Sequence, residues 1–218
     1  MARPMTNIEA GREQLLELVE GLIKQRGATS VTLSELAGAA GMSPANIYRF
    51  FENKEALFEA AAERWFAPKI RVMEEVVESN LPVRQKLYDF FARRFVMMRD
   101  KCIEDPVLFN SYMELGEEHF EIIRGYVDLG DHYLAMIVAD AMDEGFFKGL
   151  SIDRTVSLIN LMIQPFCNPA MIALLIHSVS EEKLDLIIDS ILVGLESKAE
   201  TGVEQDNVIP IGQLRGVA

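Results

Sequence analysis

Three histidines and two cysteines are the side chains best able to bind a metal or act as nucleophiles. They are His119, His132, His177, Cys102 and Cys167. Metal ligands on one helix are usually three or four residues apart, and none of these histidine pairs has that spacing. Glu117 and Glu118 give His119 an acidic setting, but an ordinary core or surface histidine explains it more simply. We therefore expect no metal, no cofactor and no catalytic set of nucleophile and base.

Binding of a nucleic acid is indicated instead by two short helices on either side of a tight turn. The segment LSELAGAAGMSPANIYRFF, residues 33–51, predicts helices over 33–40 and 44–50. Ala37 is small enough for these helices to cross closely, and Gly41 stands where the turn requires a positive φ. The residues that would fill the angle are Leu36, Met42, Ile47 and Phe50. This spacing is typical of a helix-turn-helix, although a plain helical hairpin has the same small-residue crossing.

The second of these helices has the features of an element that reads a DNA groove. Ser43 suits the N-cap and Pro44 the first helical position. The first turn then presents short side chains and backbone N–H groups, which attract phosphate. We expect phosphate contacts from Thr32, Tyr48, Asn53 and Lys54. We expect contacts in the groove from Ser43, Ala45, Asn46 and Arg49.

The string SPANIYRFFENKEALF, residues 43–58, resembles the recognition helix and linker of the tetracycline-repressor (TetR/AcrR) family. The resemblance is carried by Tyr48, Phe50, Phe51, the pair Lys54-Glu55 and the pair Leu57-Phe58. It extends over residues 8–63, and Arg49 departs from the smaller or different groups of many relatives. The resemblance implies a homodimeric transcriptional regulator, usually a repressor that a small-molecule ligand releases from DNA.

The same resemblance implies a ligand pocket within residues 80–200. An apolar cavity with a few polar groups suits a hydrophobic or aromatic ligand. The candidate lining residues are Phe95, Met98, Cys102, Phe109, Tyr112, Met113, Phe120, Tyr126, Met136, Phe146, Phe166 and Asn168. Each of them, taken singly, is also explained as an ordinary core residue of a helical bundle.

The last two predicted helices carry more apolar residues than one inward face requires. The final helix has one stripe formed by Leu184, Ile187, Ile188, Ile191, Leu192 and Leu195, and Leu186 and Val193 lie on another side. Two apolar faces indicate packing against the chain's own core and against a second copy. We assign Leu184, Ile188, Ile191, Leu192 and Leu195 to a two-fold four-helix dimer interface. The alternative is a final helix that is wholly buried.

Apolar residues recur at helical spacing along nearly the whole chain, which predicts an all-α protein of about nine helices. The expected helices cover residues 7–27, 33–40, 44–50, 54–79, 83–102, 105–115, 117–145, 152–178 and 181–198. Pro165 and Pro169 should kink the eighth helix or split it. The expected organisation is a helix-turn-helix DNA-binding domain over 1–53, a connecting helix over 54–79, a ligand-binding and dimerisation domain over 80–200, and a flexible tail over 201–218.

Charge limits how the chain can meet DNA. The net charge is −13, and residues 1–65 hold seven Lys or Arg against nine Glu. Any DNA contact must therefore be local and oriented. The longest apolar stretch, residues 158–179, is broken by Pro165, Asn168 and Pro169, so we expect no membrane span. Two cysteines without close spacing suit free thiols in a reducing cytoplasm.

These features predict a cytoplasmic regulator that binds double-stranded DNA at a near-palindromic operator as a homodimer. We expect the helix over 54–79 to act as a lever between a small-molecule effector and the DNA. Two other classes stay open. One is a helical protein-binding adaptor that has lost specific DNA binding, which the near-neutral N-terminal part favours. The other is an all-α enzyme, for which the sequence offers no catalytic residues.

Overall fold

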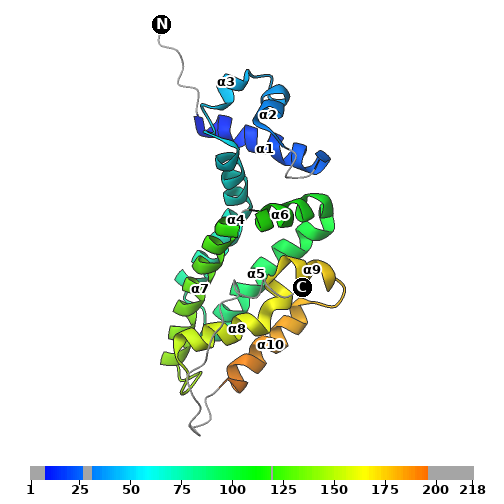
Figure 1. Ribbon diagram of the computed structural model, residues 1–218. Coiled ribbons are helices and arrows are strands. Elements are labelled where there is room, and N and C mark those ends of the chain that lie inside the picture. Colours follow the sequence, from blue (N-terminus) through cyan, green and yellow to red (C-terminus); the bar gives the residue numbers. More distant parts are fainter. Residues whose placement is uncertain (1–7, 27–30, 119, 196–218) are drawn as a thin grey trace, which may run out of the picture.

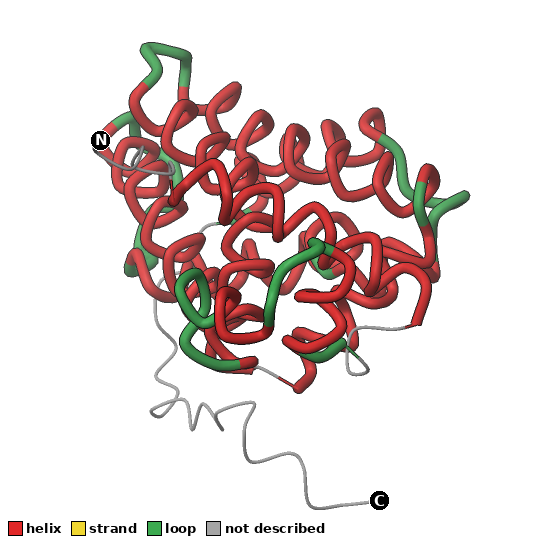
Figure 2. The backbone as a smooth tube through the Cα atoms, turned by 90° about the horizontal axis from the view of Figure 1, so that it is seen from above, coloured by secondary structure: helices red, strands yellow, loops and turns green. Residues whose placement is uncertain are grey.

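The computed structural model describes residues 8–26, 31–118 and 120–195, and over these residues the chain is helical and has no strand (Figures 1 and 2). The helices are α1 Ile8–Arg26, α2 Leu33–Ala39, α3 Pro44–Ile47, α4 Lys54–Glu78, α5 Val83–Glu104, α6 Pro106–Glu118, α7 Phe120–Asp143, α8 Ile152–Cys167, α9 Pro169–Leu174 and α10 Glu181–Gly194. The all-α prediction is confirmed. The predicted tail over 201–218 lies outside the described residues. None of the described helices is long and apolar enough to cross a bilayer.

The predicted helix over 152–178 is split in two at Asn168. The side-chain oxygen of Asn168 accepts hydrogen bonds from the backbone N–H groups of Ala170 at 3.0 Å and Met171 at 3.2 Å. This bonding caps α9, and Pro169 takes its first position. Pro165 remains inside α8. Asn168, which the sequence suggested as a pocket residue, thus has its side-chain oxygen engaged in starting a helix.

The first hydrophobic core joins α1, α2, α3 and the first half of α4. Its fully buried members include Val19, Leu36 and Ile47. The same core also contains Leu108 and Tyr112, together with Leu115, from α6. In Figure 1, α6 lies directly beneath α1. Helix α6 therefore packs against the N-terminal helices, although its sequence position suggested the ligand-binding domain.

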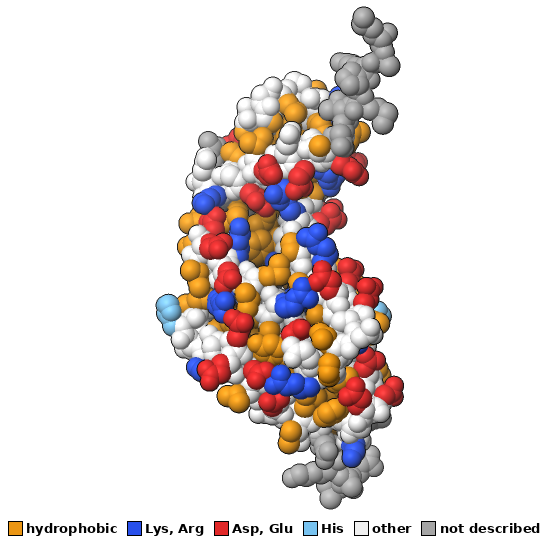
Figure 3. Space-filling model, turned by 180° about the vertical axis from the view of Figure 1, so that it is seen from behind, with side chains coloured by type: hydrophobic (Ala, Val, Ile, Leu, Met, Phe, Trp, Pro, Cys, Tyr) orange, Lys and Arg blue, Asp and Glu red, His pale blue; other side chains and the backbone are white. Residues whose placement is uncertain are grey.

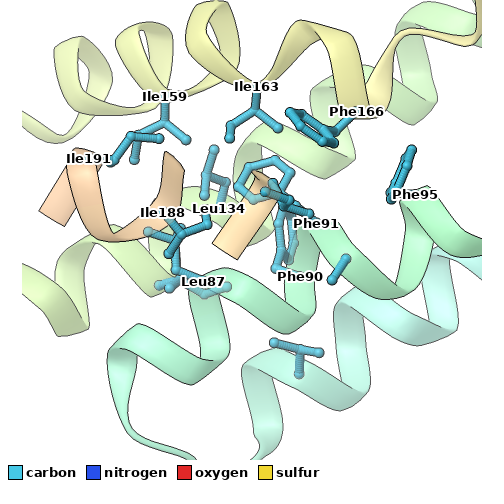
Figure 4. Packing of buried hydrophobic residues seen from close by; sticks show 14 of the residues in the cluster. Leu87, Phe90, Phe91, Phe95, Leu134, Ile159, Ile163, Phe166, Ile188 and Ile191 are labelled. Atoms are coloured by element: carbon cyan, nitrogen blue, oxygen red, sulfur yellow. The ribbon is translucent and has the colours of Figure 1, made fainter. Parts of the chain in front are cut away.

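The second core is formed by the rest of α4, α5 and α7–α10, together with Phe109 of α6, and Figure 4 shows its centre. The buried side chains there include Phe90, Phe91 and Phe95 of α5, Ile159, Ile163 and Phe166 of α8, and Ile188 and Ile191 of α10. The rings of Phe95 and Phe166 meet edge to face, with centroids 5.3 Å apart. Truncating one such buried ring to Ala costs about 3–5 kcal/mol.

The dimer-interface prediction is wrong for the inward face of α10. Leu184, Ile188 and Ile191 are completely buried within their own chain, and Leu192 is 7% exposed. They pack into the second core, so they are not available to a partner. Leu195, at the helix C-cap, is half-buried. The outward face is the other apolar side of the helix, where Leu186 is 60% and Val193 is 82% exposed.

Two cationic side chains buried in the second core, Lys86 and Arg94, have contacts that stabilise their charges. Lys86 of α5 forms an ion pair with Asp140 of α7 at 3.0 Å and also donates to the carbonyl of Val77. Arg94 of α5 donates to the carbonyl of Phe90 at 2.7 Å and lies over the ring of the same residue. These contacts supply partners to groups that would otherwise be costly to bury.

Lys69 of α4 is buried differently. Its ammonium donates to the carbonyl of Trp65 at 2.7 Å and lies 4.0 Å from the centre of the Trp65 ring. Pro68, one residue earlier, has no N–H to contribute to the helix. No carboxylate pairs with Lys69 among the described residues, since the ion pairs found there do not include it. Burial, reinforced by the like charge of Lys101, lowers the pKa of Lys69 to about 7.

The free energy of unfolding of the wild type should increase as the pH rises above neutrality. Replacing Lys69 with Met should reduce this increase. The unfolded lysine titrates near pH ~10.4, so between about pH 7 and pH 10 the unfolded chain binds more protons than the native one. The free energy of unfolding of the wild type should then rise with pH, by up to about 1.4 kcal/mol per unit from this group. Urea unfolding from pH 6 to pH 10 measures it, with Lys148→Met as the exposed control. Parallel curves for wild type and Lys69→Met would contradict the lowered pKa.

Candidate nucleic-acid interface

A capping box fixes the start of α2. The Thr32 hydroxyl accepts a hydrogen bond from the backbone N–H of Glu35 at 3.2 Å, and the Thr32 N–H donates to the Glu35 carboxylate at 3.1 Å. The hydroxyl also donates to that carboxylate at 2.9 Å. Thr32 therefore has no hydrogen left to give to a phosphate in this structure. The residue thus positions α2, and its contact with a phosphate stays a prediction.

The turn between α2 and α3 has the geometry that its residues predict. Ala37 is 1% exposed at the point where α2 meets α3. Gly41 has a φ of +63°. The N–H of Gly41 bonds to the carbonyl of Gly38 at 3.2 Å, and the N–H of Met42 bonds to that of Ala37 at 2.9 Å. This pair of bonds is a Schellman motif, which ends a helix on a left-handed glycine.

Helix α3 is shorter than predicted, because only Pro44–Ile47 is α-helical. The chain then continues in tighter turns, in which the N–H groups of Arg49 and Phe50 bond to carbonyls three residues back, at 3.2 Å and 2.8 Å. The predicted helix over 44–50 is thus a four-residue helix with an extension. Ser43 is its N-cap in backbone conformation, but its side chain makes no capping bond.

The inner side of this segment is fixed against α1. Ile47 and Phe51 are completely buried in the first core. Arg12 of α1 donates to the carbonyl of Phe50 at 3.2 Å and lies 4.8 Å from the centre of the Phe51 ring. A Cβ at Gly11 would lie 2.8 Å from the Phe50 ring, so a larger residue there would displace that ring. These contacts hold the inner face of the segment rigidly on α1.

The outer side carries the residues predicted to read the groove. Ser43, Ala45 and Arg49 are exposed, and Asn46 is half-buried. The guanidinium of Arg49 donates to the side-chain oxygen of Asn46 at 3.3 Å, so the two polar groups lie together. The structure thus brings the four predicted groove residues to one exposed surface. We name the outward side of residues 43–49 the recognition face.

Three residues predicted to bind phosphate lie within the recognition face or just after it in the chain. Tyr48 is 57% exposed. The side-chain oxygen of Asn53 accepts from the N–H of Ala56 at 2.7 Å and so caps α4, which leaves its amide hydrogens to donate. Lys54 lies 5.0 Å from the centre of the Phe58 ring. On the face that Figure 3 shows, the top of the molecule is mostly uncharged, and the charged side chains gather below it.

The predicted ligand-pocket residues are scattered. Phe95, Met98, Phe109, Tyr112 and Phe166 are buried in the two cores, and Cys102, Met113, Tyr126 and Phe146 are half-buried. Phe120 and Met136, at 59% and 43% exposure, lie on the outside of α7 and cannot line an interior site. Of these residues, Tyr112 lines a small cavity in the described part of the chain. That cavity, of about 10 Å³ between α4, α6 and α7, has room for one water molecule.

A larger cleft, which the sequence did not predict, lies between α1 and α4. It has a volume of about 580 Å³ and is lined by Glu9, Arg12, Glu13, Leu16, Ala60, Glu63, Arg64, Ala67, Pro68 and Arg71. Beside it, Arg64 of α4 forms ion pairs with Glu13, Glu17 and Glu20 of α1. The spacing of these glutamates along one helix face is a signal that could have predicted an acidic stripe.

Glu20 also connects α1 to α6. It accepts a hydrogen bond from the Tyr112 hydroxyl at 3.0 Å and lies 3.3 Å from the Arg64 guanidinium. The Tyr112 ring is stacked on Trp65 of α4, with centroids 4.3 Å apart. The burial of Tyr112 beside the Glu20 carboxylate raises its phenol pKa. We name these four residues the junction; they join three helices where the two cores meet.

The histidines do not form a metal site within the described residues. His132 and His177 are exposed, and His119 lies outside the described part of the chain. Across the described residues, no three histidine, cysteine or acidic side chains are grouped to hold a metal ion. Cys102 and Cys167 are both free thiols, and burial raises the pKa of Cys167 to about 11, which keeps it protonated.

Comparison with known proteins identifies the family. Residues 15–61 match the family described as bacterial regulatory proteins, tetR family, and residues 83–188 match the tetracyclin repressor-like C-terminal domain. The first match includes the whole recognition face, and the second runs from the start of α5 into α10. The chain belongs to the tetR family of bacterial regulatory proteins.

Individual relatives are distant. The fatty acid metabolism regulator protein of Bacillus subtilis (strain 168) is 24% identical over 125 residues, which are 56% of this chain and 64% of that protein. The alignment thus covers less than two thirds of this curated relative. FadR from Bacillus subtilis in complex with stearoyl-CoA has a TM-score of 0.61 at 19% identity, covering 84% of this chain and 98% of that one. NalD, the secondary repressor of the MexAB-OprM multidrug efflux pump in Pseudomonas aeruginosa, has a TM-score of 0.62 at 16% identity, covering 87% and 98%. These two structures share the fold.

Substitution of Gly41 tests the turn that presents α3. Gly41→Ala should destabilise the protein by about 1–2 kcal/mol, because the left-handed conformation strains a residue with a Cβ although there is space for it. Gly38→Ala is the matched control, since Gly38 is an exposed residue of α2 that also has space for a Cβ. It should be stabilising by about 0.5–1 kcal/mol. Thermal unfolding measures both, and equal effects would contradict the assigned turn.

Proposed function

We propose that this chain is a cytoplasmic, homodimeric transcriptional repressor that binds operator DNA and is released by a small hydrophobic effector. The observation that carries the proposal is the recognition face: Ser43, Ala45 and Arg49 are exposed on a segment whose opposite side is buried and anchored to α1. Short side chains let the backbone approach a duplex closely, and the rigid inner side fixes the orientation. Membership of the tetR family supports the same function.

Arg49 and Asn46 are the residues that specify sequence in this proposal. In the major groove, arginine pairs best with the O6 and N7 acceptors of guanine, and asparagine pairs best with adenine. The bond between the Arg49 guanidinium and the Asn46 side-chain oxygen leaves the Asn46 amide hydrogens and most Arg49 donors for base acceptors. We therefore expect a guanine in each operator half-site, contacted by Arg49.

Tyr48, Asn53 and Lys54 position the protein on the phosphates in this proposal. Tyr48 lies within the recognition face and the other two follow it in the chain, and all three side chains carry the kind of donor that contacts phosphate oxygens. Two cations elsewhere in the N-terminal part are already engaged, because Lys24 pairs with Asp105 at 2.8 Å and Arg64 pairs with the glutamates of α1. With these two cations engaged, binding should depend on salt less steeply than in a strongly basic domain.

The dimer interface of the proposal is the outward face of α8 and α10. Leu161 and Met162 of α8 are 65% and 43% exposed, and Leu186 and Val193 of α10 are 60% and 82% exposed. Exposed apolar residues on two neighbouring helices are typical of a subunit interface. Two such helices from each protomer would form a two-fold four-helix contact. Two recognition faces could then lie about 34 Å apart, in successive major grooves.

The effector signal passes through α4 and the junction in this proposal. Trp65 of α4 packs against both hydrophobic cores. Tyr112 stacks on Trp65 and is hydrogen-bonded to Glu20 of α1. A ligand that displaces α6 or the second half of α4 would therefore move α1 and the recognition face with it. The stearoyl-CoA complex of FadR supports the idea that this fold can hold a hydrophobic effector. A coupling of roughly 1–3 kcal/mol between the two sites is typical of such systems.

Selection from a pool of random duplexes tests the DNA-binding proposal. The full chain, at a stated salt concentration near 0.15 M, should enrich a near-palindromic site. Arg49→Ala should weaken binding to the selected duplex by about 1–3 kcal/mol and lose preference at the contacted guanine. Fluorescence anisotropy measures the affinity. Arg93→Ala is the matched control, because Arg93 is an exposed arginine of α5 paired with Glu75. Enrichment of no sequence would reject the function, and would favour a protein-binding adaptor.

A charge on the outward face of α10 tests the interface. Val193→Asp should produce monomers, because two carboxylates would meet near the two-fold axis in an apolar contact. Ile103→Asp is the control, since Ile103 is 62% exposed on α5, outside the proposed interface. Sedimentation velocity reports the mass of each variant. A Val193→Asp protein that remains dimeric would place the interface elsewhere.

A further inference from the structure

Lys69 is unusual because it is buried without an opposite charge. Its side chain is in contact with Trp65 and Phe66, with the ammonium 4.0 Å and 5.7 Å from the two ring centres. The residue is 4% exposed. The charged group that acts on it is Lys101 of α5, which has the same sign. A buried cation that meets rings and a like charge, but no described carboxylate, can take an anion from outside the chain.

The rings beside Lys69 also form the wall of the small cavity between α4, α6 and α7. Its lining residues are Ala62, Trp65, Phe66, Tyr112, Leu115, Gly116 and Ile123. The lining is almost wholly apolar, apart from the phenol of Tyr112. Lys69 is not itself a lining residue; it adjoins the cavity through the shared rings of Trp65 and Phe66. An apolar wall with an ammonium beside its rings is complementary to a molecule with an acidic head and an apolar body.

We propose that Lys69 binds the carboxylate of the effector, an amphipathic organic acid whose apolar part lies against Trp65, Phe66 and Tyr112. This inference rests on the proposed function and defines the chemical class of its ligand. Binding would supply the counter-charge that Lys69 lacks. A neutral amphiphile would fill the apolar wall but leave the ammonium unpaired, and a cationic one would be repelled.

The cavity must widen to accept such a molecule, and the contacts around it show what would move. At present it has a volume of about 10 Å³. Gly116 of α6 lies so close to Ile123 of α7 that a Cβ on the glycine would be 2.9 Å from the isoleucine side chain. Tyr112, one helical turn before Gly116, is the residue hydrogen-bonded to Glu20 of α1. Widening between α4 and α6 would therefore strain the junction and shift α1.

The intrinsic tryptophan fluorescence of the chain can report this binding. Trp65 is its single tryptophan, and its ring is one of the two that contact the Lys69 ammonium. Its fluorescence should therefore respond to an anion at Lys69. The full chain is titrated with decanoate and 4-phenylbutyrate and with the matching alcohols, 1-decanol and 4-phenylbutanol. We expect at least one acid to bind with a saturable fluorescence change, about tenfold or more tightly than its alcohol.

Two variants assign the preference to Lys69. Lys69→Met should lose the preference for the acid while still binding the alcohol, and Lys69→Arg, which keeps the charge, should retain it. Lys148→Met is the control for removing an exposed lysine. Thermal unfolding in parallel shows that each variant is folded. Equal affinity for acid and alcohol in the wild type would overturn the proposal. So would a preference that survives in folded Lys69→Met, or the absence of a saturable response to either acid.

Failure of this inference can be told from failure of the proposed function. The acid-binding titrations contain no DNA, and the duplex selection contains no acid. If the wild type selects an operator but binds neither acid, the proposed function is supported and the proposed ligand class is rejected. A wild type that binds the acid through Lys69 but selects no DNA sequence keeps the site and loses the regulatory role.

Discussion

The long helix α4, which contributes buried residues to both hydrophobic cores, is the constraint on which the rest of this structure depends. Leu57 and Ala61, near the start of α4, are buried with α1, α2 and α3. Met73 and Val76, near its end, are buried with α5 and α7–α10. Trp65 lies between them and packs against both cores. Because an α-helix is stiff over this length, neither core can shift relative to α4 without a response at its other end.

Polar contacts at the middle of α4 make that response specific. A hydrogen bond from Tyr112 to Glu20 connects α6 to α1, and an ion pair between Glu20 and Arg64 connects α1 to α4. Pro68 interrupts the backbone bonding of α4 just after this point, and the Lys69 ammonium bonds to the carbonyl of Trp65 there. Pro68 and Lys69 thus lie beside the residues that connect the cores. In Figure 1 the recognition segment is at one end of this helix and the second core is at the other.

The sequence predicted local features well, because these depend on residues close together in the chain. The positive φ of Gly41, the capping box of Thr32 and Glu35, and the split near Pro169 all follow from short-range rules. Long-range placement was less predictable. Periodicity identified two apolar faces on α10 but not which one turns inward, because that depends on the neighbouring helices. The packing of Tyr112 near α1 and the burial of Lys69 were missed for the same reason. The sequence around each of these residues has the pattern of an ordinary amphipathic helix.

In the proposed complex, two copies of the recognition face read one duplex from the same side. Hydroxyl-radical footprinting of the full-length wild type on its selected duplex tests this most directly, because it reports protected sugars at single-nucleotide resolution. We expect two protected patches related by two-fold symmetry, with centres about one helical turn, or roughly 34 Å, apart. A single patch, an asymmetric pattern or uniform protection along the duplex would contradict the proposed complex.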